Sequence, residues 1–167
     1  MYFSKFPQIT YTLDGGDTGF IVTDFFRRVI AQNQDLTTAF SYDEYDIVDG
    51  ETPEIVAHKV YSNAELHWVV LIANNIIDPR YDWPMPVQVL QNFVTNKYGV
   101  GNELDIHHYE NSAGDVVHVS YTAGPKTAVT NYEYEESLNE QKRRIKLLKP
   151  GFVEIFIKNF ERVLRNG

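Results

Sequence analysis

The histidines in the second half of the chain come closest to a set of residues that could do chemistry. His107 and His108 are adjacent, and His118 lies across a predicted hairpin from them. Because neighbouring residues of a strand point to opposite faces, we expect the two rings on opposite sides, and His118 could approach either one of them. A zinc site there would need a third ligand, for which Asp105 and Glu110 are the candidates. We interpret these residues as a polar hairpin face and expect no metal.

The other chemical signals in the sequence are weaker still. His58 and His67 lack the spacing of the HExxH zinc motif, and Gly99-Val100-Gly101 is too short for a phosphate loop and lacks its lysine. We expect His67, which precedes an apolar run, to hydrogen-bond to a loop carbonyl. The chain has no cysteine, which excludes disulfides, thiolate metal sites and cysteine nucleophiles. We therefore expect no enzyme activity, no cofactor and no small-molecule substrate.

Charge and hydropathy exclude two further classes of partner. The net charge is −8, whereas nucleic-acid binding needs clustered Lys and Arg. The one basic run, Lys142 to Lys146, follows an acidic stretch, an order that favours one solvated helix. The richest apolar stretch, Trp68 to Ala73, is too short to cross a bilayer, and we expect neither a signal peptide nor a membrane contact. The aromatic content is 14%, and the tyrosines and phenylalanines outside core patterns suit either a protein interface or the chain's own core.

The elements that must position these residues follow from local signals. Residues 1 to 41 suggest an extended arm followed by a short helix from Thr23-Asp24. A strand over 42–48 precedes Thr52-Pro53-Glu54, whose cap, proline and first-turn acid predict a helix start. The next helix, over 63–74, is apolar on most of its circumference and is expected at the centre of the core. The predicted core residues are Tyr61, Leu66, Trp68, Val69 and Trp83.

The second half of the chain is expected to extend this core. A helix from Pro86 precedes a hairpin over 104–110 and 115–121. A polar helix over 133–142, a strand over 145–148 and an amphipathic helix from Val153 follow.

Part of the chain resembles a LysM module, a βααβ fold. The span from Tyr45 to Tyr61, with its turn Asp49-Gly50-Glu51-Thr52, resembles the first half of the motif. The second half matches Leu66, Asn74 or Asn75, Ile77, Asp78 and Pro79. If the module bound peptidoglycan, the resemblance would place its groove at Gly50, Glu51, Thr52, Ile77, Asp78 and Pro79. Sugar-binding modules, however, usually accompany a signal peptide or a linker to a catalytic domain, and neither is expected here.

A longer match covers most of the chain. It runs from the aromatic N-terminal arm through Asp24-Phe25-Phe26-Arg27-Arg28, the LysM turn, His67-Trp68 and Asp82-Trp83-Pro84 to a charged helix–strand–helix tail. This order resembles the LysM-containing baseplate wedge subunit of T-even-like contractile-tailed bacteriophages. The combination of His67-Trp68 with Asp82-Trp83-Pro84 is the most specific part, because sugar-binding modules do not usually carry it.

The resemblance implies a structural protein of the virion tail baseplate, assembled in the host cytoplasm. It would link neighbouring wedges and bind other wedge proteins and the sheath initiator or hub; peptidoglycan binding is the alternative. We expect an α+β protein with an N-terminal arm and short helix (1–41), a LysM-like module (42–86) and a helix, hairpin and helix–strand–helix extension (87–167). The predicted partner interface comprises Tyr2, Phe3, Phe6, Tyr109, Tyr121, Phe156 and Phe160.

Overall fold

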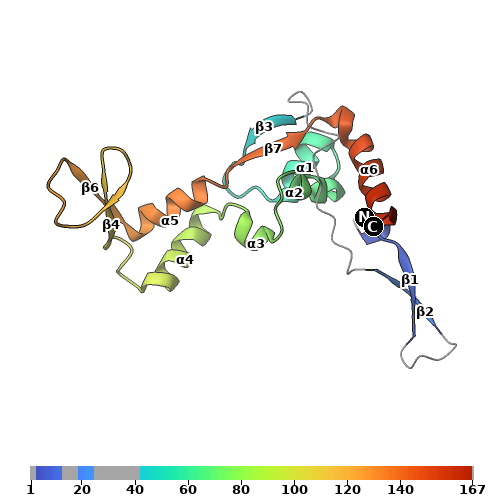
Figure 1. Ribbon diagram of the computed structural model, residues 1–167, viewed down its shortest axis with the longest axis horizontal. Helices are drawn as coiled ribbons and strands as arrows, with labels where there is room; N and C mark the ends of the chain where they lie inside the picture. Colours follow the sequence, from blue (N-terminus) through green and yellow to red (C-terminus); the bar gives the residue numbers. More distant parts are fainter. Residues whose placement is uncertain (1–2, 13–18, 25–41, 167) are drawn as a thin grey trace. The chain divides into compact units, whose positions relative to one another are not determined.

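The computed structural model describes residues 3–12, 19–24 and 42–166, which combine helices with small sheets and confirm the predicted α+β class (Figure 1). The chain forms two compact units. Unit 1 consists of Met1–Tyr45, Thr52–Arg80 and Ile145–Gly167, and unit 2 consists of Asp46–Glu51 and Tyr81–Arg144. Both units are therefore built from segments that are distant in the sequence. The helix predicted from Thr23-Asp24 falls almost entirely outside the described residues.

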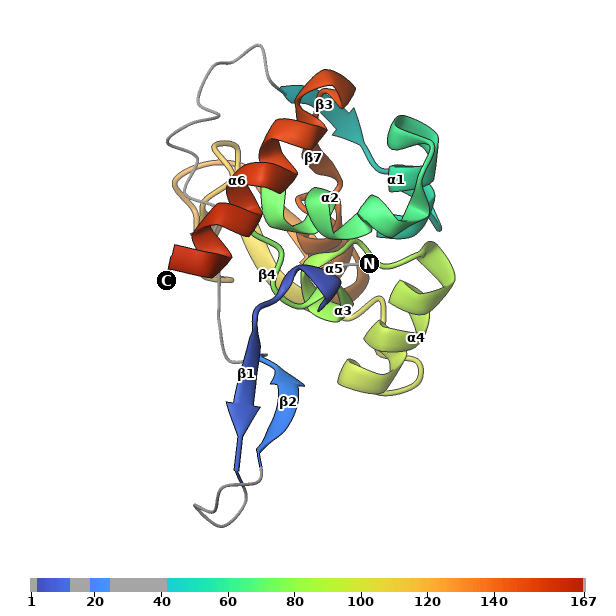
Figure 2. The same ribbon diagram turned by 90° about the vertical axis from the view of Figure 1, so that its right-hand side faces the viewer.

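Unit 1 begins with a short 3-10 helix, η1 (Phe3–Lys5), and a two-stranded hairpin. Strands β1 (Gln8–Tyr11) and β2 (Phe20–Thr23) pair antiparallel, and the amide of Asp24 donates to the carbonyl of Pro7 at the base of the hairpin (2.9 Å). The hairpin is drawn in blue in Figures 1 and 2. The predicted extended arm is thus a paired hairpin, because the apolar residues of β2 lie opposite β1.

The helices of the LysM-like region begin and end where the local signals place them. Strand β3 (Tyr42–Asp46) leads to α1 (Pro53–Tyr61), whose first turn is capped by the Thr52 hydroxyl. Ser62 adopts a left-handed conformation (φ 56°) and ends α1. A 3-10 turn, η4 (Ala64–Leu66), then leads into α2 (His67–Ala73).

The partner of β3 comes from the far end of the chain. β3 pairs with β7 (Arg144–Leu148), whereas residues 74–86 contain only the short helix α3 (Pro79–Asp82) (Figure 1). The side chain of Asn74 bonds to both the amide and the carbonyl of Lys146, each at 2.8 Å, and so fastens the end of α2 to β7. The βααβ order is therefore β3, α1, α2 and β7, and a long segment of the chain separates α2 from β7. That residues 42–86 form a LysM-like module stays a prediction.

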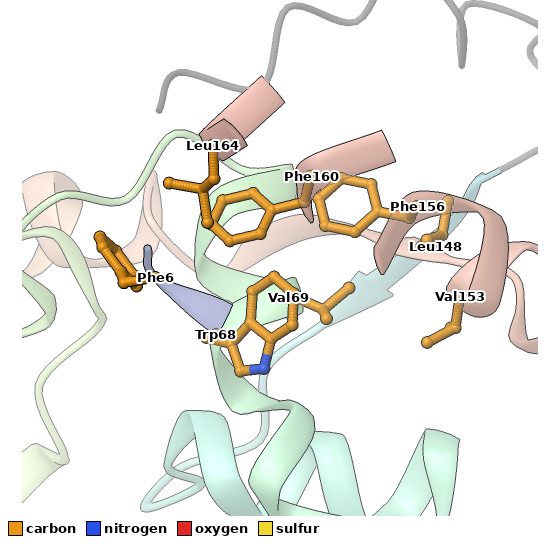
Figure 3. Packing of buried hydrophobic residues seen from close by; sticks show 8 residues of the cluster. All are labelled: Phe6, Trp68, Val69, Leu148, Val153, Phe156, Phe160 and Leu164. Atoms are coloured by element: carbon orange, nitrogen blue, oxygen red, sulfur yellow. The ribbon is translucent and has the colours of Figure 1, made fainter. Parts of the chain in front are cut away.

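The core of unit 1 lies between α2, β7 and α6 (Val153–Asn166) (Figure 3). Trp68 is at its centre, with its ring 5.0 Å from that of Phe160 and 6.1 Å from that of Phe156, centroid to centroid. Tyr61 and Leu66 are half-buried and pack against this cluster. The cluster consists of Phe6, Trp68, Val69, Leu148, Val153, Phe156, Phe160 and Leu164.

Unit 2 contains helices α4 (Val87–Tyr98) and α5 (Asn131–Glu140) and a three-stranded sheet. The predicted hairpin is present as β4 (Ile106–Asn111) and β5 (Val116–Val117), and a third strand, β6 (Lys126–Thr130), pairs with the other edge of β4. β6 is not apparent from the sequence, because its five residues hardly alternate and directly follow Gly124-Pro125.

The polar helix of unit 2 differs from the solvated helix that its charges predict. α5 starts with a capping box between Thr130 and Glu133 and ends at Glu140, so the basic run lies beyond it and enters β7. Its buried side is polar and includes Glu135 and Asn139, which are 6% and 1% exposed.

Candidate protein-interaction surfaces

The two adjacent histidines meet each other rather than facing apart. The Nδ1 atoms of His107 and His108 are 2.8 Å apart, and His108 Nε2 is 3.0 Å from the Glu110 carboxylate. The expectation that the two rings lie on opposite faces is wrong because the β4–β6 register shifts between Ile106 and His108. Such an irregularity re-aims the neighbouring side chains.

These histidines form local contacts instead of a ligand set. His118 bonds to the hydroxyl of Ser120, at 2.7 Å. Among residues 3–12, 19–24 and 42–166, no three histidines or carboxylates converge in a way that could hold a metal ion. The Nδ1 atom of His67 lies 3.0 Å from the carbonyl of Ala64, so the predicted bond to a backbone carbonyl is present, although its acceptor belongs to the 3-10 turn η4 (Ala64–Leu66) rather than to a loop.

A second polar cluster joins the two helices of unit 2. The carboxylate of Glu135 accepts bonds from the Lys97 ammonium (2.6 Å) and the Tyr98 hydroxyl (2.8 Å). Burial opposes ionisation of Glu135, but the bonds from Lys97 and Tyr98 outweigh it, and the pKa of Glu135 is lowered. The same bond raises the pKa of Lys97. The cluster thus holds an ion pair between Lys97 and Glu135.

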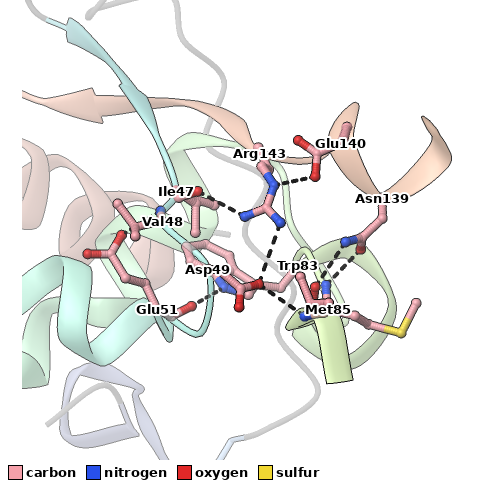
Figure 4. A network of polar contacts seen from close by, with 10 residues as sticks. Ile47, Val48, Asp49, Glu51, Trp83, Met85, Asn139, Glu140 and Arg143 are labelled. Atoms are coloured by element: carbon pink, nitrogen blue, oxygen red, sulfur yellow. Dashed lines mark hydrogen bonds and ion pairs between the residues drawn. The ribbon is translucent and has the colours of Figure 1, made fainter. Parts of the chain in front are cut away.

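The LysM-type turn is occupied by contacts within unit 2 (Figure 4). Gly50 has a positive φ of 79°, and the Glu51 carboxylate accepts from the amide of Val48 at 2.9 Å. The indole of Trp83 donates to the Glu51 carbonyl at 2.7 Å. This bond connects the segment Asp82-Trp83-Pro84 to the turn.

The same network caps the helix that follows Trp83 and includes Arg143. The Asp49 carboxylate accepts from the amide of Val87 at 3.0 Å and so caps α4, whose own N-cap, Pro86, has no side-chain bond to offer. Arg143 donates to the carbonyl of Ile47 at 3.1 Å and contacts Asp49 at 3.6 Å. These polar groups are engaged inside unit 2.

The six groove residues of the peptidoglycan-binding alternative do not all belong to one unit. Gly50 and Glu51 lie in unit 2, whereas Thr52, Ile77, Asp78 and Pro79 lie in unit 1. Thr52 caps α1, and Asp78 forms an ion pair with Arg80 at 2.9 Å, which lowers the pKa of Asp78. Ile77 is 72% exposed.

The predicted partner interface is divided by the structure. Phe6, Phe156 and Phe160 are buried in the core of unit 1, which corrects their assignment to an outer surface (Figure 3). They pack around Trp68 because α6 places two of them one turn apart on its apolar face. Tyr109 and Tyr121 are half-buried in unit 2, and Tyr2 and the side chain of Phe3 lie outside the described residues.

The exposed apolar side chains of unit 1 are concentrated instead on the hairpin β1–β2. Every residue of β1 is exposed, as are the first three of β2. The apolar members are Ile9, Tyr11, Phe20, Ile21 and Val22, between 38% and 72% exposed. The sequence-based prediction placed an aromatic interface in the arm at Tyr2, Phe3 and Phe6, whereas the run of three apolar residues Phe20-Ile21-Val22 was the available signal for the exposed apolar segment.

Unit 2 has its own exposed apolar residues around the start of β4. Val100, Leu104 and Ile106 are 87%, 78% and 54% exposed. Their exposure makes this stretch a candidate for an interaction site, which contiguous exposed apolar surface marks.

Comparison with known proteins agrees with a structural role. The family described as Base plate wedge protein 53 matches residues 1–126, and the chain belongs to this family. The baseplate wedge protein gp53 of Enterobacteria phage T4 is 27% identical over an alignment of 191 positions, which covers 100% of this chain and 97% of that relative. Membership of the family supports a structural role in a phage baseplate. No helix within the described part of the chain is long and apolar enough to cross a membrane.

Proposed function

We propose that this chain is a structural subunit of a phage tail baseplate wedge and that it links neighbouring wedge proteins during tail assembly. The observation that carries the proposal is the division of a member of this family into two units, each with its own exposed apolar residues. A protein that binds one partner needs one such surface, whereas a linker needs two.

The two surfaces are held by separate cores. In unit 1 the Trp68 cluster supports the segment that leads into the hairpin, because Phe6 is buried two residues before β1 starts. In unit 2 the sheet is continuous with α5, since the amides of Asn131 and Tyr132 donate to the carbonyls of Asp105 and Glu103 (2.9 Å each). The loop that carries Leu104 is thereby fixed to the start of α5.

The partners in this proposal are other wedge proteins and the sheath initiator or hub, and the site of action is the tail baseplate of the virion after assembly in the host cytoplasm. The protein acts by binding, without catalysis or a cofactor. Its polar clusters support this assignment, because Glu135, Asp49 and Glu51 make bonds within the chain.

Co-expression with the other wedge proteins and the sheath initiator of the same phage tests the proposal. We expect the affinity-tagged chain to purify with at least two of them, and the variant Leu104→Ser/Ile106→Thr to lose one partner and keep another. A chain that stays monomeric and unbound at micromolar concentration with every candidate would refute the linking role.

A further inference from the structure

The register of the hairpin β1–β2 separates its side chains into two faces. Ile9 lies opposite Val22, and Tyr11 lies opposite Phe20. Since alternate residues of a strand share a face, and so do directly opposed residues, these four side chains form one continuous apolar face. We call this set, Ile9, Tyr11, Phe20 and Val22, the hairpin face.

The other side of the hairpin is mostly polar. It carries Gln8 opposite Thr23 and Thr10 opposite Ile21. Gly19 approaches it closely, because a Cβ atom at this position would lie 2.2 Å from Cγ2 of Thr10. One face of the hairpin is thus apolar and the other mostly polar, the pattern of a sheet that buries one face and exposes the other to water.

No described residue covers the hairpin face. Its members are 39%, 53%, 60% and 38% exposed in the order Ile9, Tyr11, Phe20, Val22. A two-stranded ribbon is only marginally stable in water and needs a third strand or a packed face. Tyr and Phe are also the side chains that anchor protein interfaces with the fewest rotatable bonds. Among the described residues, the hairpin face therefore has the exposure and the side chains of a binding surface.

We infer that the hairpin face docks onto an uncharged, apolar surface of another baseplate protein, an inference that rests on the linking role proposed above. The chemistry of the occupant follows from charge: the chain as a whole has a net charge of −8, yet neither strand of the hairpin contains a charged residue. Burial of a charge against four apolar side chains would be unfavourable without a partner charge.

A second copy of this chain is a poorer occupant. The four side chains offer roughly 300 Å², whereas a stable interface buries about 800 Å² on each partner. Two hairpins face to face would therefore not hold a dimer by themselves. A different protein that also contacts the rest of the chain supplies the missing area, as expected in a multi-subunit assembly.

The test compares two neighbouring residues that point to opposite sides. Phe20→Thr removes an anchor of the hairpin face, and Ile21→Thr, at a residue that is 72% exposed against 60% for Phe20, makes a similar change on the other side. Threonine suits both strand positions. Binding of the full-length variants to the partner captured by the unmodified chain is measured at low and high salt by biolayer interferometry.

We expect Phe20→Thr to weaken binding by roughly tenfold or more, Ile21→Thr to change it by less than about threefold, and salt to have little effect. Equal losses in both variants, or no loss in either, would overturn the inference while the linking role stands. If the unmodified chain captures no baseplate protein, the linking role itself fails. A concentration-dependent dimer in light scattering that Phe20→Thr abolishes would assign the hairpin face to a second copy of the chain. Retention of the chain on neutral lipid vesicles would assign the hairpin face to a lipid surface. Either result overturns the inference.

Discussion

Asn139 supports a stringent test of how unit 2 is held together. Its side chain is 1% exposed, accepts from the amide of Met85 at 2.7 Å and donates to the carbonyl of the same residue at 2.9 Å. Asn139→Ala leaves both backbone groups in a part-buried position without these partners, and each unsatisfied group costs about 1–3 kcal/mol. We therefore expect the variant to lose about 2–6 kcal/mol of the free energy of unfolding of unit 2.

The two tryptophans make this measurement specific, because Trp68 lies in unit 1 and Trp83 in unit 2. In a Trp68→Phe background, urea unfolding followed by tryptophan fluorescence reports unit 2 alone. The matched control is Asn96→Ala, the same change at an exposed position of α4, where the helix propensity of alanine should keep the effect within about 0.5 kcal/mol. If Asn139→Ala unfolds at the same urea concentration as the control, the bonds to Met85 do not stabilise the unit and the reasoning is refuted.

Three further outcomes are expected. Trp68→Ala should cost about 3–5 kcal/mol in unit 1, seen as a lower Tm, and Trp68→Phe should cost much less; equal melting would show that α2 is not central. Burial raises the pKa of Tyr61 to about 12 from 10.0, so folding favours its protonated form. The stability that this form contributes is complete below pH 10 and is lost as the pH rises toward 12. Urea titrations at about pH 9 to 12 should therefore show a smaller alkaline loss of stability in Tyr61→Phe than in the unmodified chain. Purified peptidoglycan should retain the chain no better than an unrelated acidic protein, since Thr52 and Asp78 make bonds within unit 1; clear retention would favour the sugar-binding alternative.

The features that the sequence determined by itself are those set by neighbouring residues. The start of α1 follows from Thr52-Pro53-Glu54, because a cap, a fixed φ and a first-turn acid act within one helical turn. The burial of Trp68 and Val69 agrees with the apolar circumference of α2, and the apolar face of α6 is present as its periodicity indicates. These signals also supported the family resemblance that the comparisons confirmed.

The tertiary structure alone decided what depends on distant segments. β3 pairs with β7, and the bonds between Asn74 and Lys146 fasten the end of α2 to that strand. These residues are far apart in the sequence, so local sequence signals do not reveal the pairing. Asn139 and Glu135 resemble surface residues in the sequence, yet their partners, Met85 and Lys97, bring them into the interior. Composition likewise cannot distinguish an aromatic residue that is buried in a core from one that is exposed on the surface. Phe160 and Phe20 are the same side chain, and only the surrounding chain buries the first and leaves the second 60% exposed.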